Sequence, residues 1–399
     1  MKLEALPYHI DVAKHLRTDE AALWAWFESD QFSLRYTEKV KLELLKSTYR
    51  LTRADQPSIY AQVDSVREKL GVDLPATIYQ HQGGSGDANA ALVFLPDELA
   101  IMLMGNISDL LGEKEMLALL GHEISHHHLY CLDAGHYFTA ARLLEWCTQQ
   151  PGCEASYLET DRLYRLHTEI FADMGALHVT GERDAVISCL IKVATGLKKV
   201  TPSSYLEQAD EILKQYKQGS EGVTHPEMFI RAKALDLLTA DPPKLKEVAT
   251  LVRGPIDTKR LDLVAQHALC TLTRKLLDQI LSYSFMRGEY TANLAERYFA
   301  GYKWPDAVHS TADQANLAEE IAAMTRAGHD FLAYVLLDFA TVDPEGGETA
   351  LALTLQLAER VGLLPIYEPI ARKELKRKKD DLANLKRSNA DLIDRVSHA

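Results

Sequence analysis

The feature that most constrains this chain is the segment from Gly112 to His126, which is predicted to form a single helix. Two acidic residues, Glu113 and Glu115, would lie in its first turn, where a helix favours negative charge, and apolar residues follow at helical spacing. His122 and His126 are four residues apart, so both imidazoles leave the same face of the helix, one turn apart. This separation suits two nitrogens on one tetrahedral metal ion.

Glu123 follows His122 in the sequence but lies about 100° around the helix from it. Its carboxylate is therefore poorly placed as a third ligand and well placed to accept a proton from a water on the metal. The His-Glu-x-x-His spacing with these roles is typical of zinc peptidases. Because the chain holds 15 histidines, the alternative is a polar helix that carries this spacing by chance.

A third ligand is expected from a later segment. One known zinc pattern continues with Gly and His three and six residues after the second histidine, but Leu129 and Leu132 occupy those positions. The predicted helix at 166–177 instead carries Glu169 and Asp173 on one face. Two acids on an otherwise apolar helix are costly to bury unless they are paired or bound to a cation. The alternative is a half-exposed helix with ordinary surface acids.

The two segments together resemble the M48 family of gluzincin metallopeptidases, which has membrane-embedded and soluble members. The residues that carry the resemblance are His-Glu-x-x-His at 122–126 and Glu-x-x-Ala-Asp at 169–173. Weaker matches flank them: Asn89-Ala90 before an apolar strand, residues 103–111 before the zinc helix, and Thr224-His225-Pro226 with Arg231. The resemblance covers about residues 70–240.

The resemblance implies a role for each central residue. His122, His126 and Glu169 would bind one zinc ion per chain, and Glu123 would be the general base. Asp173 would accept the N–H of a ligand imidazole and so orient it.

Two further roles follow from the same resemblance. His225, with Arg231 in support, would stabilise the oxyanion, although a histidine at a helix start before a proline is an equally good reading. The strand that contains Ala90, Ala91 and Leu92 would be the edge strand that binds an extended substrate through its backbone. Residues 82–87 are expected to form a loop, either a hairpin connection or a flap over the cleft.

Composition and charge indicate which classes of binding partner are expected. The chain has 399 residues, 47% hydrophobic and 25% charged, with a net charge of −13 and no large basic tract before its last helix. This balance argues against a nucleic acid as the main partner. No run of about 18 apolar residues occurs, so no membrane span is expected, unlike much of the M48 family. The N-terminus has no signal-peptide pattern, and five cysteines without Cys-x-x-Cys spacing indicate free thiols in the cytoplasm.

The expected fold is mainly α-helical with a small β-sheet: a gluzincin-type core flanked by helical regions. Short strands are predicted at 76–80, 90–95 and 99–104, and amphipathic helices at 39–49 and 59–70. The predicted domains are an N-terminal helical region at 1–74, a metallopeptidase core at 75–240, and a C-terminal helical domain at 241–399. The last boundary rests on Asp241-Pro242-Pro243.

The C-terminal region contains two further patterns. The segment 343–348 weakly resembles the loop of TerB-like helical domains, where Asp343 and Glu348 would bind a cation; the alternative is an acidic loop between helices. A final charged helix is predicted at 366–396, with leucines at a and d positions. It either packs on its own domain or pairs between subunits of a homo-oligomer.

The sequence therefore predicts a zinc-dependent endopeptidase that hydrolyses proteins or peptides. A zinc-activated water would attack the scissile carbonyl, with Glu123 as general base. The alternative is a latent or non-catalytic protein, in which zinc supports the fold and the helical domains bind partners as in a chaperone or adaptor.

Overall fold

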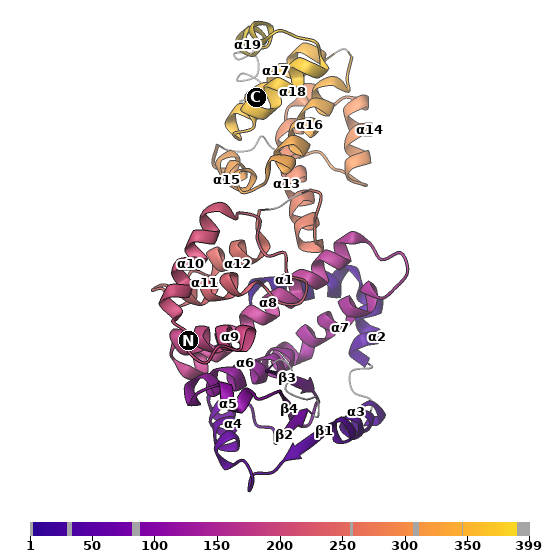
Figure 1. The fold of residues 1–399 in the computed structure, drawn as a ribbon. Helices are drawn as coiled ribbons and strands as arrows, with labels where there is room; N and C mark the ends of the chain where they lie inside the picture. Colours follow the sequence, from indigo (N-terminus) through magenta and orange to yellow (C-terminus); the bar gives the residue numbers. More distant parts are fainter. Residues whose placement is uncertain are drawn as a thin grey trace. The chain divides into compact units, whose positions relative to one another are not determined.

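The chain forms two compact units, residues 1–254 (unit 1) and 255–399 (unit 2), and Figure 1 labels the helices and strands of each. The described residues are mainly helical, with one four-stranded sheet in unit 1. This confirms the predicted combination of many helices with a small sheet. The structure is a computed structural model that describes residues 3–29, 34–81, 88–255, 258–305, 311–344 and 346–388.

Unit 1 is built from a sheet and the helices before and after it. The strands are β1 (Thr48–Leu51), β2 (Ala76–His81), β3 (Asn89–Phe94) and β4 (Leu99–Met104). The helices are α1 (Pro7–Asp19), α2 (Ala21–Ser29), α3 (Leu34–Ser47), α4 (Pro57–Leu70), α5 (Ile107–Leu110), α6 (Glu113–Cys131), α7 (His136–Thr148), α8 (Ala155–Thr180), α9 (Arg183–Thr195), α10 (Pro202–Gln215), α11 (Met228–Leu238) and α12 (Leu245–Arg253).

The strands lie in the order β1-β2-β4-β3, so β3 is an edge strand. β2 and β4 are parallel, and the other two pairs are antiparallel. The predicted strands correspond to β2, β3 and β4. The predicted helix at 39–49 extends too far, because Thr48–Leu51 pairs with β2 instead. This pairing joins segments about 30 residues apart, and local periodicity carries no signal for it. The predicted loop at 82–87 lies outside the described residues.

Helices α6 and α8 cross in close contact because small residues stand at the crossing. A Cβ atom on Gly175 would overlap the Ser125 side chain, and a Cβ atom on Gly121 would lie 3.2 Å from the Cα of Ala176. Both helices are buried over this stretch. The crossing therefore brings the histidine face of α6 against the acidic face of α8.

Helix α12 belongs to unit 1, because the boundary between the two units comes after it, at Gly254. α12 packs on α11 and α8, and Val252 is fully buried there. The Asp241-Pro242-Pro243 segment, where the sequence predicted a domain boundary, is a connection inside unit 1. The predicted regions 1–74 and 75–240 also share one unit, since α1 packs on α7 and α8.

Unit 2 has a helical core of its own. Its helices are α13 (Leu263–Leu281), α14 (Glu289–Tyr298), α15 (Thr311–Ala322), α16 (Arg326–Thr341), α17 (Gly347–Arg360), α18 (Leu364–Glu374) and α19 (Lys379–Ser388). Leucines of α13, α16 and α17 fill the core around the fully buried Tyr367. The Tyr367 hydroxyl lies 2.8 Å from Oγ1 of Thr354.

The prediction of one continuous final helix at 366–396 is wrong for the described residues. α18 and α19 are separated at Lys376, which has a left-handed φ of 53°. Lysines and arginines crowd residues 372–379, and like charges at helical spacing destabilise a helix. Leu382 of α19 is buried against unit 2 itself, so this part of the segment packs on its own domain. Residues 389–396 lie outside the described part of the chain.

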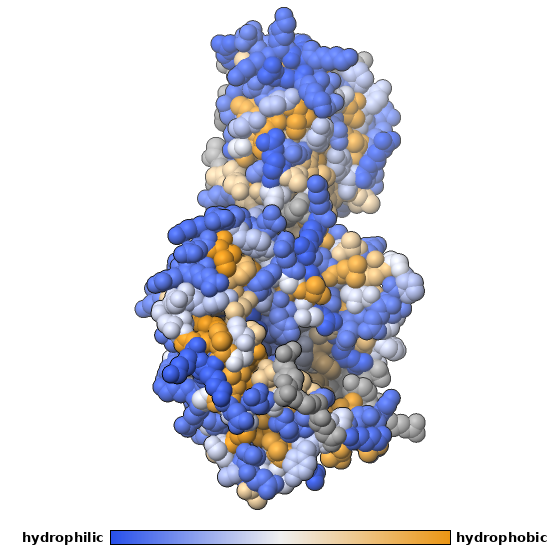
Figure 2. Space-filling view, viewed as in Figure 1, coloured by the Kyte–Doolittle hydropathy of each residue, from blue (hydrophilic) through white to orange (hydrophobic). Residues whose placement is uncertain are grey.

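Hydrophilic residues predominate on the face of the molecule shown in Figure 2, and hydrophobic residues form small patches between them. Among the residues that the structure describes, no helix has both the length and the apolar character needed to cross a bilayer.

Candidate metal centre

Three side chains converge where α6 crosses α8. His122 and His126 extend from α6 and Glu169 extends from α8, and one ligand atom of each lies within 4.8 Å of the others. The two Nε2 atoms are 3.3 Å apart. Nε2 of His122 lies 3.3 Å from Oε2 of Glu169, and Nε2 of His126 lies 3.6 Å from Oε1. The structure thus brings together the three residues that the sequence predicted as metal ligands.

The chemistry of this cluster fits a cation. Glu169 is buried, and its Oε2 lies 3.3 Å from Nε2 of His122 and 3.6 Å from Nη2 of Arg231, so the groups around this carboxylate favour its charged form. Nδ1 of His122 lies 3.0 Å from Oδ1 of Asp173. A neutral imidazole that donates from Nδ1 presents a lone pair at Nε2. Lone pairs of two imidazoles and a carboxylate would then face one point, an arrangement that a metal ion stabilises.

The pKa values of the three clustered side chains are shifted by burial and by one another. Burial lowers the pKa of His122, but hydrogen bonds to Asp173 and Glu169 outweigh it and raise that pKa to about 10. Burial lowers the pKa of His126 to about 4. Burial raises the pKa of Glu169, yet the neighbouring His122 outweighs burial and holds that pKa well below its usual range. At neutral pH, a proton on His122 therefore partly takes the place of a cation.

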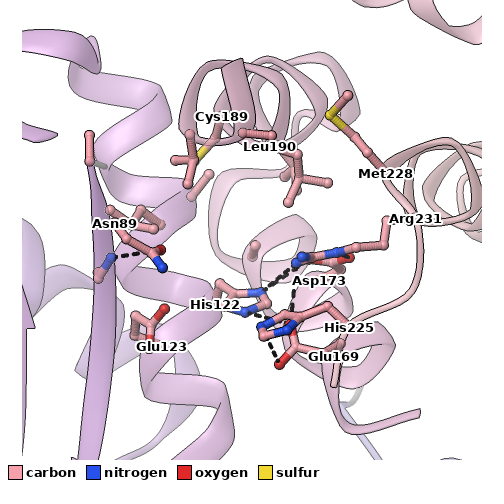
Figure 3. A pocket seen from close by; sticks show the side chains of 18 of the residues that line it. Asn89, His122, Glu123, Glu169, Asp173, Cys189, Leu190, His225, Met228 and Arg231 are labelled. Atoms are coloured by element: carbon pink, nitrogen blue, oxygen red, sulfur yellow. Dashed lines mark hydrogen bonds and ion pairs between the residues drawn. The ribbon is translucent and has the colours of Figure 1, made fainter. Parts of the chain in front are cut away.

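Asp173 is held from two sides. Arg231 of α11 donates from Nη2 to Oδ1 at 2.6 Å and from Nε to Oδ2 at 2.8 Å, and His122 lies on Oδ1. The Asp173 side chain is only 1% exposed. Burial raises its pKa, but the charge of Arg231 outweighs this and lowers it. Arg231, which the sequence analysis assigned to support His225 at the oxyanion, instead lies beside Asp173, with Nη2 3.4 Å from Nδ1 of His122 (Figure 3).

Glu123 lines the same cavity as the three clustered side chains but is not one of them. It is 6% exposed and lies between β3 and His122 in Figure 3. Burial raises the pKa of Glu123, while the charge of His122 and a hydrogen bond from the backbone of Leu92 lower it in part, so the net shift is upward. A carboxylate with a raised pKa is a better proton acceptor at neutral pH.

The edge strand β3 borders the cavity. Its residues Ala90, Ala91 and Leu92 line the cavity and pair on the other side with Leu103, Met102 and Ile101 of β4. The N–H of Ala90 donates to Oδ1 of its neighbour Asn89 at 2.9 Å (Figure 3), and the backbone of Leu92 donates to Glu123 in the cavity. Since backbone groups alternate along a strand, Ala90 and Leu92 present theirs on the side away from β4.

His225 lies in the segment before α11, at the mouth of the cavity. Its side chain is 59% exposed, and Nε2 lies 3.4 Å from Oε1 of Glu169. Nδ1 lies 2.9 Å from Oγ1 of Thr224. The structure therefore brings His225 beside the cluster, 56 residues along the chain from its nearest member Glu169.

The sequence analysis missed one wall of the site. The cavity has a volume of about 980 Å³, and apolar side chains of α9 line it together with Met228 (Figure 3). The α9 residues recur at helical spacing and are Val186, Cys189, Leu190 and Val193. This periodicity was visible in the sequence, but it is equally typical of a core-facing helix.

The remaining histidines near the motifs have other contacts. Nε2 of His127 lies 3.1 Å from the carbonyl oxygen of Leu95, and Nδ1 of His167 lies 2.8 Å from that of Leu163. Within the described ranges, no second group of three or more His, Cys, Asp or Glu side chains is arranged to hold a metal. In the predicted TerB-like loop, Glu348 pairs with Arg377 at 3.3 Å.

Comparisons of the chain with protein-family models, with curated proteins and with solved structures gave no match.

Proposed function

We propose that this protein is a zinc-dependent metallopeptidase of the gluzincin type, similar to the M48 family, that hydrolyses peptide bonds of proteins or peptides. The observation that carries the proposal is the convergence of His122, His126 and Glu169 beside Glu123 in one cavity. A structural metal site more often has four protein ligands, whereas three ligands leave a position open for water or substrate.

The donor set favours zinc. Two imidazole nitrogens and one carboxylate oxygen are typical of catalytic zinc sites, and a buried, charged carboxylate such as that of Glu169 is stabilised by a cation. When bound there, zinc would polarise a scissile carbonyl and lower the pKa of a water molecule. Asp173 would keep the Nδ1 proton of His122 in place, so that Nε2 remains a ligand.

Two residues would act on the reacting groups. Glu123 would accept a proton from the attacking water and deliver it to the nitrogen of the leaving amine. His225 would donate a hydrogen bond to the oxyanion, since its imidazole is exposed to the cavity mouth and close to the cluster. Arg231 is a weaker candidate for that donor because Asp173 engages its Nε and Nη2.

The edge strand supports a polypeptide substrate. An extended chain that lies along β3 would donate backbone hydrogen bonds to the carbonyl oxygens of Ala90 and Leu92, while the N–H of Ala90 is bound by Asn89 and the backbone of Leu92 donates to Glu123. Such pairing recognises the backbone of the substrate rather than a particular side chain. We therefore expect unfolded or extended segments of proteins to be the substrates.

The test compares the zinc-loaded chain with its Glu123→Gln variant on an unfolded protein, with the products identified by mass spectrometry. Glu113→Gln is the matched control, because it removes a carboxylate of the same helix that is exposed in the first turn. We expect fragments from the parent and the control, none from Glu123→Gln, and one zinc ion per chain in all three.

Two outcomes would contradict the proposal. Fragments that persist in Glu123→Gln would exclude Glu123 as the base. If no protein cleaves the substrate although each holds zinc, a latent enzyme or a zinc-supported binding protein becomes the better account.

A further inference from the structure

One arginine outside the cavity binds the segment that carries His225. Arg162 lies on α8, seven residues before Glu169, so both side chains leave the same face of one helix two turns apart. Its side chain is 11% exposed. Nη1 donates to two backbone carbonyl oxygens, that of Ser220 at 3.0 Å and that of Gly222 at 2.8 Å.

The orientation of this guanidinium is fixed by a second partner. Glu159, one turn earlier on α8, accepts from Nε of Arg162 at 2.9 Å and from Nη2 at 2.6 Å. Because Glu159 binds Nε and Nη2, the remaining nitrogen, Nη1, is the one that contacts the loop. A planar guanidinium can bind a carboxylate and two carbonyls at once, whereas a lysine ammonium has no such fork.

The backbone of Gly222 is in close contact with the backbone of His225. The loop folds back on itself so tightly that a Cβ atom on Gly222 would overlap the carbonyl oxygen of His225. A shift of the Gly222 backbone therefore moves the backbone of His225. The same α8 helix then carries both Glu169 and the residue that locates the loop above it.

Other contacts also hold this loop: the N–H of Gly222 donates to Oγ of Ser220 at 3.2 Å. Glu227 accepts from Oγ of Ser220 at 2.7 Å and from the N–H of Glu221 at 2.9 Å. The N–H of Ser220 donates to the carbonyl oxygen of Val252 at 2.8 Å. Arg162 binds the carbonyl of Gly222, three residues before His225.

We infer that Arg162 is a positioning residue for His225: by holding the Ser220 and Gly222 carbonyls to α8, it sets the imidazole beside Glu169. The inference rests on the proposed function for its effect on turnover, but the anchoring of the loop does not depend on that function. Arg162 itself does not line the cavity, so it would act on the reaction only through the loop.

The test uses hydrogen exchange and a double-mutant cycle on the full zinc-loaded chain. The variants are Arg162→Gln and Arg162→Lys, each made in the parent and in a His225→Phe background. Arg165→Gln is the matched control, because Arg165 pairs with Asp161 on the same helix at 2.9 Å and does not line the cavity.

We expect Arg162→Gln to speed exchange at least tenfold in peptides that cover residues 219–225, with no change in peptides of α6 and unaltered zinc content. We expect turnover of an unfolded protein to fall on the order of 10²-fold, as for the loss of one oxyanion donor, with little change in KM. In the His225→Phe background the same change should alter turnover less than twofold. Arg162→Lys should recover part of both effects, and Arg165→Gln should show neither.

Unchanged exchange at 219–225 in Arg162→Gln would overturn the inference, whether or not the chain is a peptidase. An equal fall in turnover in both backgrounds would also overturn it, because Arg162 would then act by another route. If the parent does not cleave proteins, the proposed function fails, and faster exchange in Arg162→Gln still supports the anchoring of the loop.

Discussion

Oδ1 of Asp173 lies 3.0 Å from Nδ1 of His122, and the same oxygen accepts a 2.6 Å hydrogen bond from Arg231. The carboxylate therefore connects a candidate ligand on α6 to a cation on α11. Because the imidazole must donate from Nδ1 to this carboxylate, its Nε2 is the atom that faces His126 and Glu169. The tautomer that a metal requires is thus selected by a residue that is not itself a ligand.

Asp173→Asn is expected to lower the affinity for zinc about 10- to 100-fold, the usual effect of losing such a partner. The amide keeps the shape of the side chain but loses the charge that holds the Nδ1 proton. Affinity would be measured by competition with a chromophoric chelator, with folding checked by circular dichroism. Asp161→Asn, which removes a carboxylate of the same helix paired with Arg165, is the control. Equal losses in the two variants would contradict the role of Asp173.

Metal binding is expected to release about one proton at pH 7. The pKa of His122 is raised to about 10, so its imidazole is protonated on both nitrogens and cationic in the metal-free protein, while His126, with a pKa lowered to about 4, is neutral. A ligand nitrogen must lose its proton, so zinc affinity should rise about tenfold per pH unit between pH 6 and 8. Calorimetric titration in buffers of different ionisation enthalpy counts the protons, and a count of zero would refute this assignment.

Gly175→Ala is expected to destabilise unit 1 by about 1–3 kcal/mol, because the added methyl group overlaps Ser125 at the α6–α8 crossing. Helix propensity alone predicts the opposite sign, since alanine favours a helix by about 1 kcal/mol over glycine. Urea unfolding followed by tryptophan fluorescence would measure the change. Zinc affinity should fall as well, since the crossing places the ligands.

A second substitution tests that mechanism. Ser125→Gly removes the side chain that the new methyl group meets, so Gly175→Ala should cost less in that background than in the parent. A coupling energy near zero between the two positions would show that the loss arises elsewhere.

The free energy of unfolding of unit 1 is expected to fall as the pH drops below about 6.5, in part because of His9. This imidazole is fully buried in an edge-to-face contact with Tyr164, at a centroid distance of 4.9 Å. Burial, with the charge of His167, lowers its pKa in the folded chain. Below that pH, His9 binds a proton in the unfolded chain but not in the folded chain. His9 therefore lowers the free energy of unfolding by up to about 1.4 kcal/mol per pH unit as the pH falls.

Urea unfolding at pH 7.5 and pH 5.5 compares the parent with His9→Gln, whose side chain is neutral at both values. We expect the variant to lose less stability between the two pH values than the parent. His15→Gln is the control for the loss of an imidazole from the same helix, because His15 is only half-buried and pairs with Asp19. A pH dependence identical in all three proteins would exclude His9 as a contributor.

Much of the candidate site could be predicted from local spacing. On a helix, residues four apart lie on the same face, so the spacing of His122 and His126, and of Glu169 and Asp173, predicts which side chains lie together. Both segments are helical in the structure. The strands β2, β3 and β4 were predictable for the same reason, since short apolar runs between turn residues are a local signal. β1 was not, because it becomes a strand only by pairing with β2.

The sequence alone therefore determined which residues share a helix face, that such a face suits a metal, and that the chain is mainly helical. Only the tertiary structure decided that the two faces meet at the Gly175–Ser125 crossing, that Arg231 binds Asp173, and that Arg162 binds the loop of His225. The physical reason is that helical periodicity is set by local backbone geometry, whereas these contacts join segments separated by tens of residues. Such contacts depend on packing that no single segment encodes.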